Sequence, residues 1–164
     1  MMLIAKIILA AAASLVEHSQ VPSIIVERGP CLGECPVYRF QVSAAGGVFE
    51  GRRFTNVSGE QRFPITATEW STFQSTLAPF RPQGTEDITA GHARCTQFAT
   101  DHASVVITWI GAGRTDQLLF NFGCKDPQND AMARTLADVP DLLAVGKLIE
   151  ERQLEDGAWD RPTK

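Results

Sequence analysis

Four cysteines are the residues of this chain with the clearest capacity for chemistry: Cys31, Cys35, Cys95 and Cys124. Cysteine side chains form disulfides in oxidising compartments, act as redox centres where the thiol pKa is lowered, and bind zinc as thiolates. The first two cysteines lie in a tight stretch that also contains Pro30, Gly33 and Pro36, and Tyr38 follows it at the start of a strand-like pattern. Two prolines, a glycine and two closely spaced cysteines in one short stretch indicate a turn with a structural role.

Disulfides are the interpretation that the cysteines favour, because their number is even and the chain begins like an exported protein. Four cysteines permit three pairings. We expect Cys31 to pair with Cys35, since that bridge closes across Gly33 without moving anything else. We expect Cys95 to pair with Cys124, which would tie a long loop to the end of a strand.

Two other interpretations use the same residues. A redox-active dithiol usually has the spacing C-x-x-C at a helix N-terminus, whereas Cys31 and Cys35 have the spacing C-x-x-x-C and precede a strand. A zinc site could combine the four cysteines, with His92 or His102 as substitutes, but the spacing matches no common zinc pattern. We therefore expect no metal and no cofactor.

Asp101, His102 and Ser104 could suggest a catalytic triad. Neighbouring residues on an extended segment alternate between its faces, so their side chains rarely converge on one point. No G-x-S-x-G nucleophile motif is present either. We expect no catalytic residues in this chain.

Residues 1–20 differ from everything after them. Lys6 precedes an apolar run over 7–16, and small residues lie at 10–13. This pattern is typical of a secretory signal, and the run is too short to cross a bilayer, although a buried core helix is an alternative. We expect export to the periplasm or cell envelope, with the segment either cleaved or kept as an N-terminal hydrophobic segment, and a single domain over 21–160.

Composition narrows the classes of partner. Hydrophobic residues make up 44% and charged residues 21% of the 164 residues, as in an ordinary globular domain. Fifteen basic and 19 acidic side chains give a net charge of -4, which argues against a nucleic-acid-binding surface. After signal removal we expect no integral membrane span.

Hydrophobic periodicity predicts the elements that must position these residues. Alternation predicts a strand over 37–44, and 48–54 can return as its partner. A β-branched run predicts a strand over 23–28, and β-prone runs predict strands over 104–110 and 117–122. Glycine-containing turns make two hairpins. Thr66 and Glu69 form a capping box that starts a helix ending near Pro79, and we expect the face carrying Trp70 to be core. Residues 81–102 have no regular period and are expected to form an extended loop.

Towards the end, residues 131–136 indicate a short helix, and Asp138 could cap a longer one with Pro140 in its first turn. The predicted order is β-β-β-α-β-β-α, with a possible further helix. We expect an α+β fold, in which an antiparallel sheet of about five strands carries helices on one face.

With these residues in view, the chain resembles a bacterial family known as domain of unknown function 6438. The resemblance depends on Pro30, Cys31, Gly33, Cys35, Pro36, Val37 and Tyr38, with weaker similarity at 48–51, 57–59, Asp101, Pro140, Leu142 and Trp159. It covers roughly 24–159. The family name carries no activity, so the resemblance implies no catalytic residue.

These observations favour a non-enzymatic module, exported to the cell envelope, that binds an envelope protein or another envelope component. The alternative is a thiol-redox or zinc-dependent activity centred on Cys31 and Cys35.

Overall fold

The described part of the chain is built on a mixed β-sheet, and alternating side chains explain why several of its strands form. The computed structural model describes residues 21–111 and 113–149, so the expected signal segment and Trp159 lie outside the described residues. The strands are β1 (Ser23–Arg28), β2 (Val37–Ser43), β3 (Gly46–Arg53), β4 (Gly59–Phe63), β5 (Thr85–Ile88), β6 (Ser104–Gly111) and β7 (Arg114–Asn121). Along β2 and β6, buried and half-buried residues alternate, as predicted for β2, because one sheet face is covered and the other is not.

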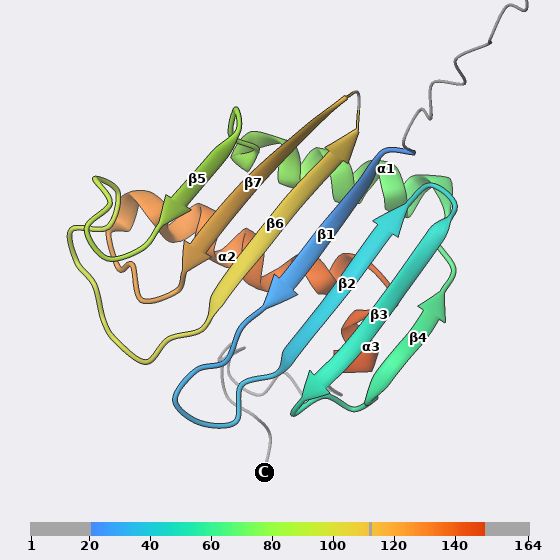
Figure 1. Ribbon diagram of the computed structural model, residues 1–164, viewed down its shortest axis with the longest axis horizontal. Coiled ribbons are helices and arrows are strands. Elements are labelled where there is room, and N and C mark those ends of the chain that lie inside the picture. Colours follow the sequence, from blue (N-terminus) through green and yellow to red (C-terminus); the bar gives the residue numbers. More distant parts are fainter. Residues whose placement is uncertain (1–20, 112, 150–164) are drawn as a thin grey trace, which may run out of the picture.

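The strand order is β4-β3-β2-β1-β6-β7-β5, which places β1 at the centre of the sheet (Figure 1). β2 with β3 and β6 with β7 form the two antiparallel hairpins that were predicted. Gly46 has a φ of +136° and pairs with Ser43, so it begins β3 directly after the turn.

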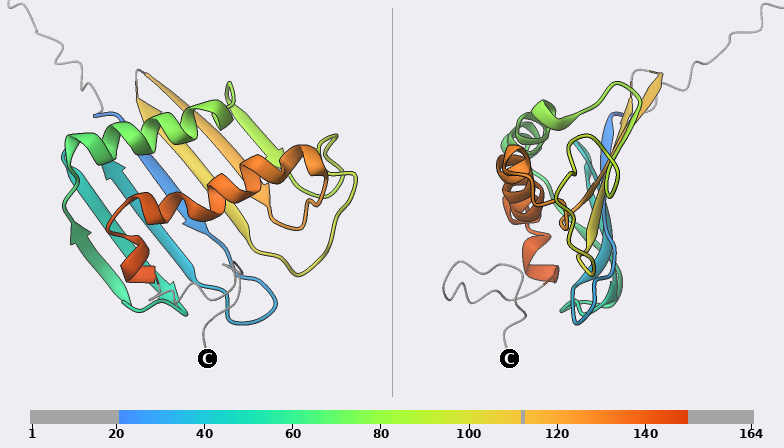
Figure 2. Two further views of the ribbon diagram at one scale, coloured as in Figure 1. Left: turned by 180° about the vertical axis from the view of Figure 1, so that it is seen from behind. Right: turned by 90° about the vertical axis from the view of Figure 1, so that its left-hand side faces the viewer.

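The helices of the described residues all lie on one face of the sheet (Figure 2). They are α1 (Ala67–Leu77), α2 (Asp130–Asp138) and α3 (Gly146–Ile149), with the 3-10 turns Ala78–Phe80, Pro127–Asn129 and Val139–Leu142. The predicted capping box is present at the start of α1: the Glu69 backbone N–H donates to Thr66 Oγ1, and the Glu69 carboxylate accepts from the Thr66 backbone N–H.

The core lies between the helices and the covered sheet face. Among its fully buried side chains are Phe40, Phe49 and Phe120 from the sheet and Phe73 and Leu77 from α1. Burial of aromatic and aliphatic side chains on this scale supplies the main driving force for folding. Phe73 and Leu77 confirm that α1 turns an apolar face towards the sheet.

The prediction of about five antiparallel strands was wrong in two places, although the α+β class is confirmed. β4 was missed because only Phe63 of its five residues is buried, so it lacks a period-two pattern. β5 lies inside 81–102, which was predicted to be an irregular loop. It has four residues and pairs in parallel with β7, so the sheet is not purely antiparallel.

The end of the described chain also differs from expectation. A longer helix capped by Asp138 does not form; instead α2 runs through Asp138, a 3-10 turn with Pro140 near its start follows, and α3 is one short turn. Pro140 ends the α-helical hydrogen-bonding pattern because it has no N–H to donate. Within the described residues, none of the helices has the length and hydrophobicity needed to cross a membrane.

Candidate functional site

The loop containing Cys31 and Cys35 joins β1 to β2. The two cysteines are bonded to each other, with their Cα atoms 5.7 Å apart. Gly33 has a φ of +126°, a conformation that L side chains rarely adopt, and this lets the chain reverse inside the bridge. The Leu32 N–H donates to the carbonyl oxygen of Asp101 at 3.0 Å, which fixes the loop to the segment before β6.

Tyr38 anchors this loop in the core. Its side chain is buried, and its ring centroid lies 6.1 Å from those of both Phe40 and Phe49. Pro30 is exposed and Pro36 is half-buried, so the two prolines flank the bridge at the surface. The stretch from Pro30 to Tyr38 therefore acts as a bridged turn that directs the chain into β2.

Cys95 and Cys124 form the second bridge, with Cα atoms 4.9 Å apart and both residues buried. Beside it the Ala99 N–H donates to the Gly123 carbonyl at 2.8 Å. This bridge holds the segment before β6 against the end of β7. The structure thus brings the sulfur atoms of both expected pairs to bonding distance.

The structure places the four cysteines in two separate bridges, so it does not gather them into a zinc-like cluster. Within residues 21–111 and 113–149, no three His, Cys, Asp or Glu side chains come together as metal ligands could. His92 lies beside Glu86, with Nε2 3.8 Å from the carboxylate, and Arg94 contacts the same group at 3.5 Å. The Cys31–Cys35 bridge leads into a strand, as predicted, and not into a helix.

Asp101, His102 and Ser104 do not form a relay. Ser104 Oγ accepts a hydrogen bond from Asn121 Nδ2 at 3.0 Å, and the exposed Asp101 carboxylate accepts one from Thr100 Oγ1. These contacts stabilise the start of β6 and the loop before it.

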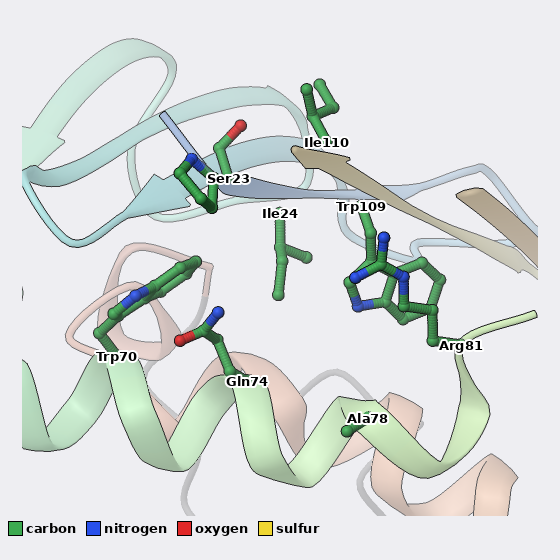
Figure 3. A pocket seen from close by; sticks show the side chains of 9 residues that line it. Ser23, Ile24, Trp70, Gln74, Ala78, Arg81, Trp109 and Ile110 are labelled. Atoms are coloured by element: carbon green, nitrogen blue, oxygen red, sulfur yellow. The ribbon is translucent and has the colours of Figure 1, made fainter. Parts of the chain in front are cut away.

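A cavity of about 170 Å³ lies between α1 and the adjoining ends of β1 and β6. Its lining residues are Pro22, Ser23, Ile24, Trp70, Gln74, Ala78, Arg81, Trp109 and Ile110. Ile24 points from β1 towards α1, with Trp70 on one side of it and Trp109 and Arg81 on the other (Figure 3). Ile24 and Trp109 are buried, while Gln74, Ala78 and Pro22 are exposed, so the cavity has an apolar floor and an open rim.

A buried carboxylate holds the arginine of this cavity in place. Arg81 Nε donates to Asp116 Oδ2 at 2.6 Å, Arg114 Nε donates to the same oxygen at 2.9 Å, and the Gly84 N–H donates to Oδ1 at 2.9 Å. The Asp116 side chain is only 2% exposed. The Gly84 N–H, followed by the two guanidinium groups, lowers the pKa of Asp116 from 3.8 to about 2. Two positive charges and one negative charge leave this cluster with one net positive charge.

The lining of the cavity suits binding better than catalysis. None of its nine lining residues is a histidine, cysteine, aspartate or glutamate. Its one hydroxyl, Ser23 Oγ, accepts a hydrogen bond from Gln41 Nε2 and lies on the opposite side of β1 from Ile24 (Figure 3). The other lining residues supply two indole rings, an amide, a guanidinium and the aliphatic side chains of Pro22, Ile24, Ala78 and Ile110. Such groups recognise apolar and polar parts of a ligand.

A second hollow, of about 380 Å³, opens where the β2–β3 turn meets the end of β4. Its lining includes Ser43, Ala45, Gly46 and Gly47, with Arg62 and Phe63 from β4. Because its two glycines offer no side chain to a ligand, we take the cavity beside α1 as the candidate site.

Sequence reasoning missed this site. Trp70 was expected to be core; it is half-buried, packs against the core and also lines the cavity. Trp109, Arg81 and Asp116 were not singled out. The one local signal was Trp109, an indole in a strand whose other residues are mostly β-branched. Its neighbours come from α1 and from the residue after the 3-10 turn Ala78–Phe80, and no local pattern predicts that proximity.

Residues 22–140 match the family model described as "Domain of unknown function (DUF6438)". The chain belongs to the DUF6438 family. The part that matches includes both bridges of the DUF6438 domain and every residue that lines its cavity. No curated protein and no solved structure is similar enough to this chain to count as a match.

Proposed function

We propose that this DUF6438 domain is a non-enzymatic binding module of the bacterial cell envelope, and that it recognises an envelope component through the cavity beside α1. One observation carries the proposal: the cavity joins two indole rings and a carboxylate-anchored arginine in a lining that has no histidine, cysteine, aspartate or glutamate and whose one hydroxyl, Ser23 Oγ, faces away from Ile24. Such a lining can hold a ligand and select for it, but it provides no group to transform it.

The cavity is positioned by rigid elements, which supports a preformed binding site. Ile24 and Trp109 lie on the adjacent central strands β1 and β6, and β1 pairs along its whole length with residues 105–110 of β6. Trp70 and Gln74 lie on α1, whose start is fixed by the capping box. Preorganised side chains of this kind lose little conformational entropy when a ligand binds.

Export is supported by two features. Residues 1–20 resemble a secretory signal, and the cysteines within the described residues are all placed in disulfide pairs, which persist in oxidising compartments. The proposal is tested by fractionating cells that express the full chain. We expect the protein in the periplasmic or envelope fraction with both bridges oxidised, and a reduced cytoplasmic protein would contradict this.

Binding is tested with soluble fragments of digested peptidoglycan, followed through the indole N–H signals of the isotope-labelled full chain by NMR. We expect saturable shifts of the Trp70 and Trp109 signals. Ala78→Phe should abolish these shifts, because the exposed Ala78 lines the cavity and a larger side chain would fill it. Shifts that are absent, or that persist in Ala78→Phe, would contradict binding of these fragments in the cavity.

A thiol-redox function is the second candidate, because Cys31 and Cys35 are half-buried in a surface loop whereas Cys95 and Cys124 are buried. An accessible bridge can be attacked by an external thiolate. Turnover of insulin reduction that depends on Cys31 and Cys35 would favour this candidate, and stoichiometric zinc in the purified protein would favour the metal-dependent form of the same alternative. If replacement of both cysteines changes only thermal stability, the binding function stands.

A further inference from the structure

We propose that the cavity beside α1 takes an apolar group that carries a carboxylate, with the apolar group between Trp70 and Trp109 and the carboxylate on the guanidinium of Arg81. This inference rests on the proposed function, because it assigns a ligand class to the same cavity. Size, charge and hydrogen-bonding capacity each support it.

Size limits the ligand to a small group. The volume is about 170 Å³, and an apolar protein cavity of roughly 150 Å³ accommodates benzene. Sites for whole drug-sized molecules are larger, from roughly 300 Å³ upwards. One ring or one branched side chain would fill the space beside Ile24. The rest of a larger ligand would extend out of the cavity past its exposed rim, which Pro22, Gln74 and Ala78 form.

The positive charge of the lining favours an anionic ligand. Arg81 is the one charged residue in the lining, and the cluster to which it belongs has two guanidinium groups for one buried carboxylate. Within the described residues Arg81 hydrogen-bonds through Nε, which leaves its two terminal nitrogens as donors. Its side chain is 34% exposed, so a ligand can reach it. Paired guanidinium N–H groups match the geometry of a carboxylate.

Gln74 offers a second polar contact beside the proposed position of the ligand carboxylate. Gln74 extends from α1 towards the interior between Trp70 and Arg81 (Figure 3), and its amide makes no hydrogen bond within the described residues. A primary amide both donates and accepts, so it can pair with an amide of the ligand. An apolar residue at the C-terminus of a peptide has this combination of groups, whereas a simple aryl carboxylic acid has the ring and the carboxylate alone.

The inference is tested by NMR titration of the full chain with four probes, read at the indole N–H signals of Trp70 and Trp109. N-acetyl-L-phenylalanine carries ring, amide and carboxylate, whereas its primary amide derivative lacks the charge and N-acetylglycine lacks the ring. We expect the acid to bind about tenfold more tightly than the amide derivative, and N-acetylglycine to cause no saturable shift. The fourth probe, 3-phenylpropanoate, distinguishes the sources: weaker binding than N-acetyl-L-phenylalanine supports a peptide C-terminus, and equal binding supports an aryl acid.

Two matched variants assign the charge preference to one residue. Arg81→Gln should remove the preference for the acid, whereas Arg114→Gln should keep it, because Arg114 contacts the same Asp116 oxygen but does not line the cavity. Thermal unfolding checks that both variants are folded. Equal affinity for the acid and its amide derivative in the unaltered protein would overturn the inference and leave the cavity as a neutral binding site. No shift with any ring-bearing probe would overturn the cavity as a ligand site altogether.

Discussion

The carboxylate of Asp116 on β7 lies 2.6 Å from Nε of Arg81, which directly follows the 3-10 turn that extends α1. This contact fixes the end of the α1 segment to the sheet, while the capping box of Thr66 and Glu69 fixes its beginning. Trp70 and Gln74 lie between these two points. The contact between Asp116 and Arg81 therefore sets both the position of α1 over β1 and the position of the Arg81 charge at the cavity.

Asp116→Asn tests the contribution of this contact to stability. The folded-state pKa of Asp116, about 2, lies below its ordinary value of 3.8, so the folded protein binds the proton more weakly than the unfolded chain. The stabilisation is therefore present above about pH 4 and is lost as the pH falls from about 4 to about 2. We expect the variant to melt at a lower temperature at neutral pH and to lose less stability over that acidic interval.

Thermal unfolding of both proteins between pH 2 and pH 7 measures the effect. Asp87→Asn is the control, because Asp87 is an exposed aspartate on the neighbouring strand β5. The control should follow the unaltered protein at every pH. If Asp116→Asn had the same acid sensitivity as the unaltered protein, this carboxylate would not be a source of its acid lability.

The two disulfides should differ in their effect on stability. The Cys31–Cys35 bridge closes a sequence separation of 4, and the Cys95–Cys124 bridge closes one of 29. The chain-entropy model gives stabilisations of ~2 and ~3.6 kcal/mol respectively. Urea unfolding of the paired variants Cys31→Ala with Cys35→Ala, and Cys95→Ala with Cys124→Ala, compares them directly. A larger loss on removal of the short bridge would show that loop length does not govern these contributions.

Local sequence signals predicted a large part of the fold. The capping box at Thr66 started α1 where expected, because the residues that satisfy the first free N–H groups are adjacent in the chain. Alternation identified β2 for a similar reason: the strand buries one face, and that face is visible in every second residue.

The missed features depend on contacts between distant segments. β5 forms because the Thr85–Ile88 segment pairs with β7, and those four residues have no period of their own. The cavity is formed by Trp70 and Trp109 among others. Trp70 lies on α1 and Trp109 on β6, and between these elements the chain runs through β5 and the connection over 89–103. Neither relationship is encoded by spacing within a single segment.

Residues 48–51 are one of the segments in which the chain resembles its family, and a steric argument explains why Gly51 on β3 is a glycine. A Cβ atom at Gly51 would lie 1.8 Å from the carbonyl oxygen of Val57, which is backbone and cannot move aside. We expect Gly51→Ala to lower the free energy of unfolding by about 3 kcal/mol, since forced overpacking has costs of this order. At Gly29 the nearest atom to a Cβ is Ser104 O at 3.7 Å, an ordinary contact. Gly29→Ala should change stability by no more than about 1 kcal/mol. Equal effects of the two variants in urea unfolding would contradict this explanation.

Thr66→Ala tests whether the start of α1 is set by its cap. Thr66 Oγ1 accepts a hydrogen bond from the Glu69 N–H at 3.2 Å, and loss of such an N-cap destabilises a protein by about 1 kcal/mol. The Thr66 hydroxyl, followed by its backbone N–H, lowers the pKa of Glu69, so part of the effect should disappear in acid as Glu69 becomes protonated. Thr66→Ser keeps the hydroxyl and should retain most of the stability.

Ligand binding separates this structural role from a direct one. Thr66 does not line the cavity, so a folded Thr66→Ala protein should keep the preference for N-acetyl-L-phenylalanine over its amide derivative. Urea unfolding and the indole N–H titration, carried out on the same two variants, measure stability and preference separately. If Thr66→Ala lost the preference while Thr66→Ser kept it, the cap would be setting the position of Trp70 and Gln74 in the cavity as well as the stability of α1.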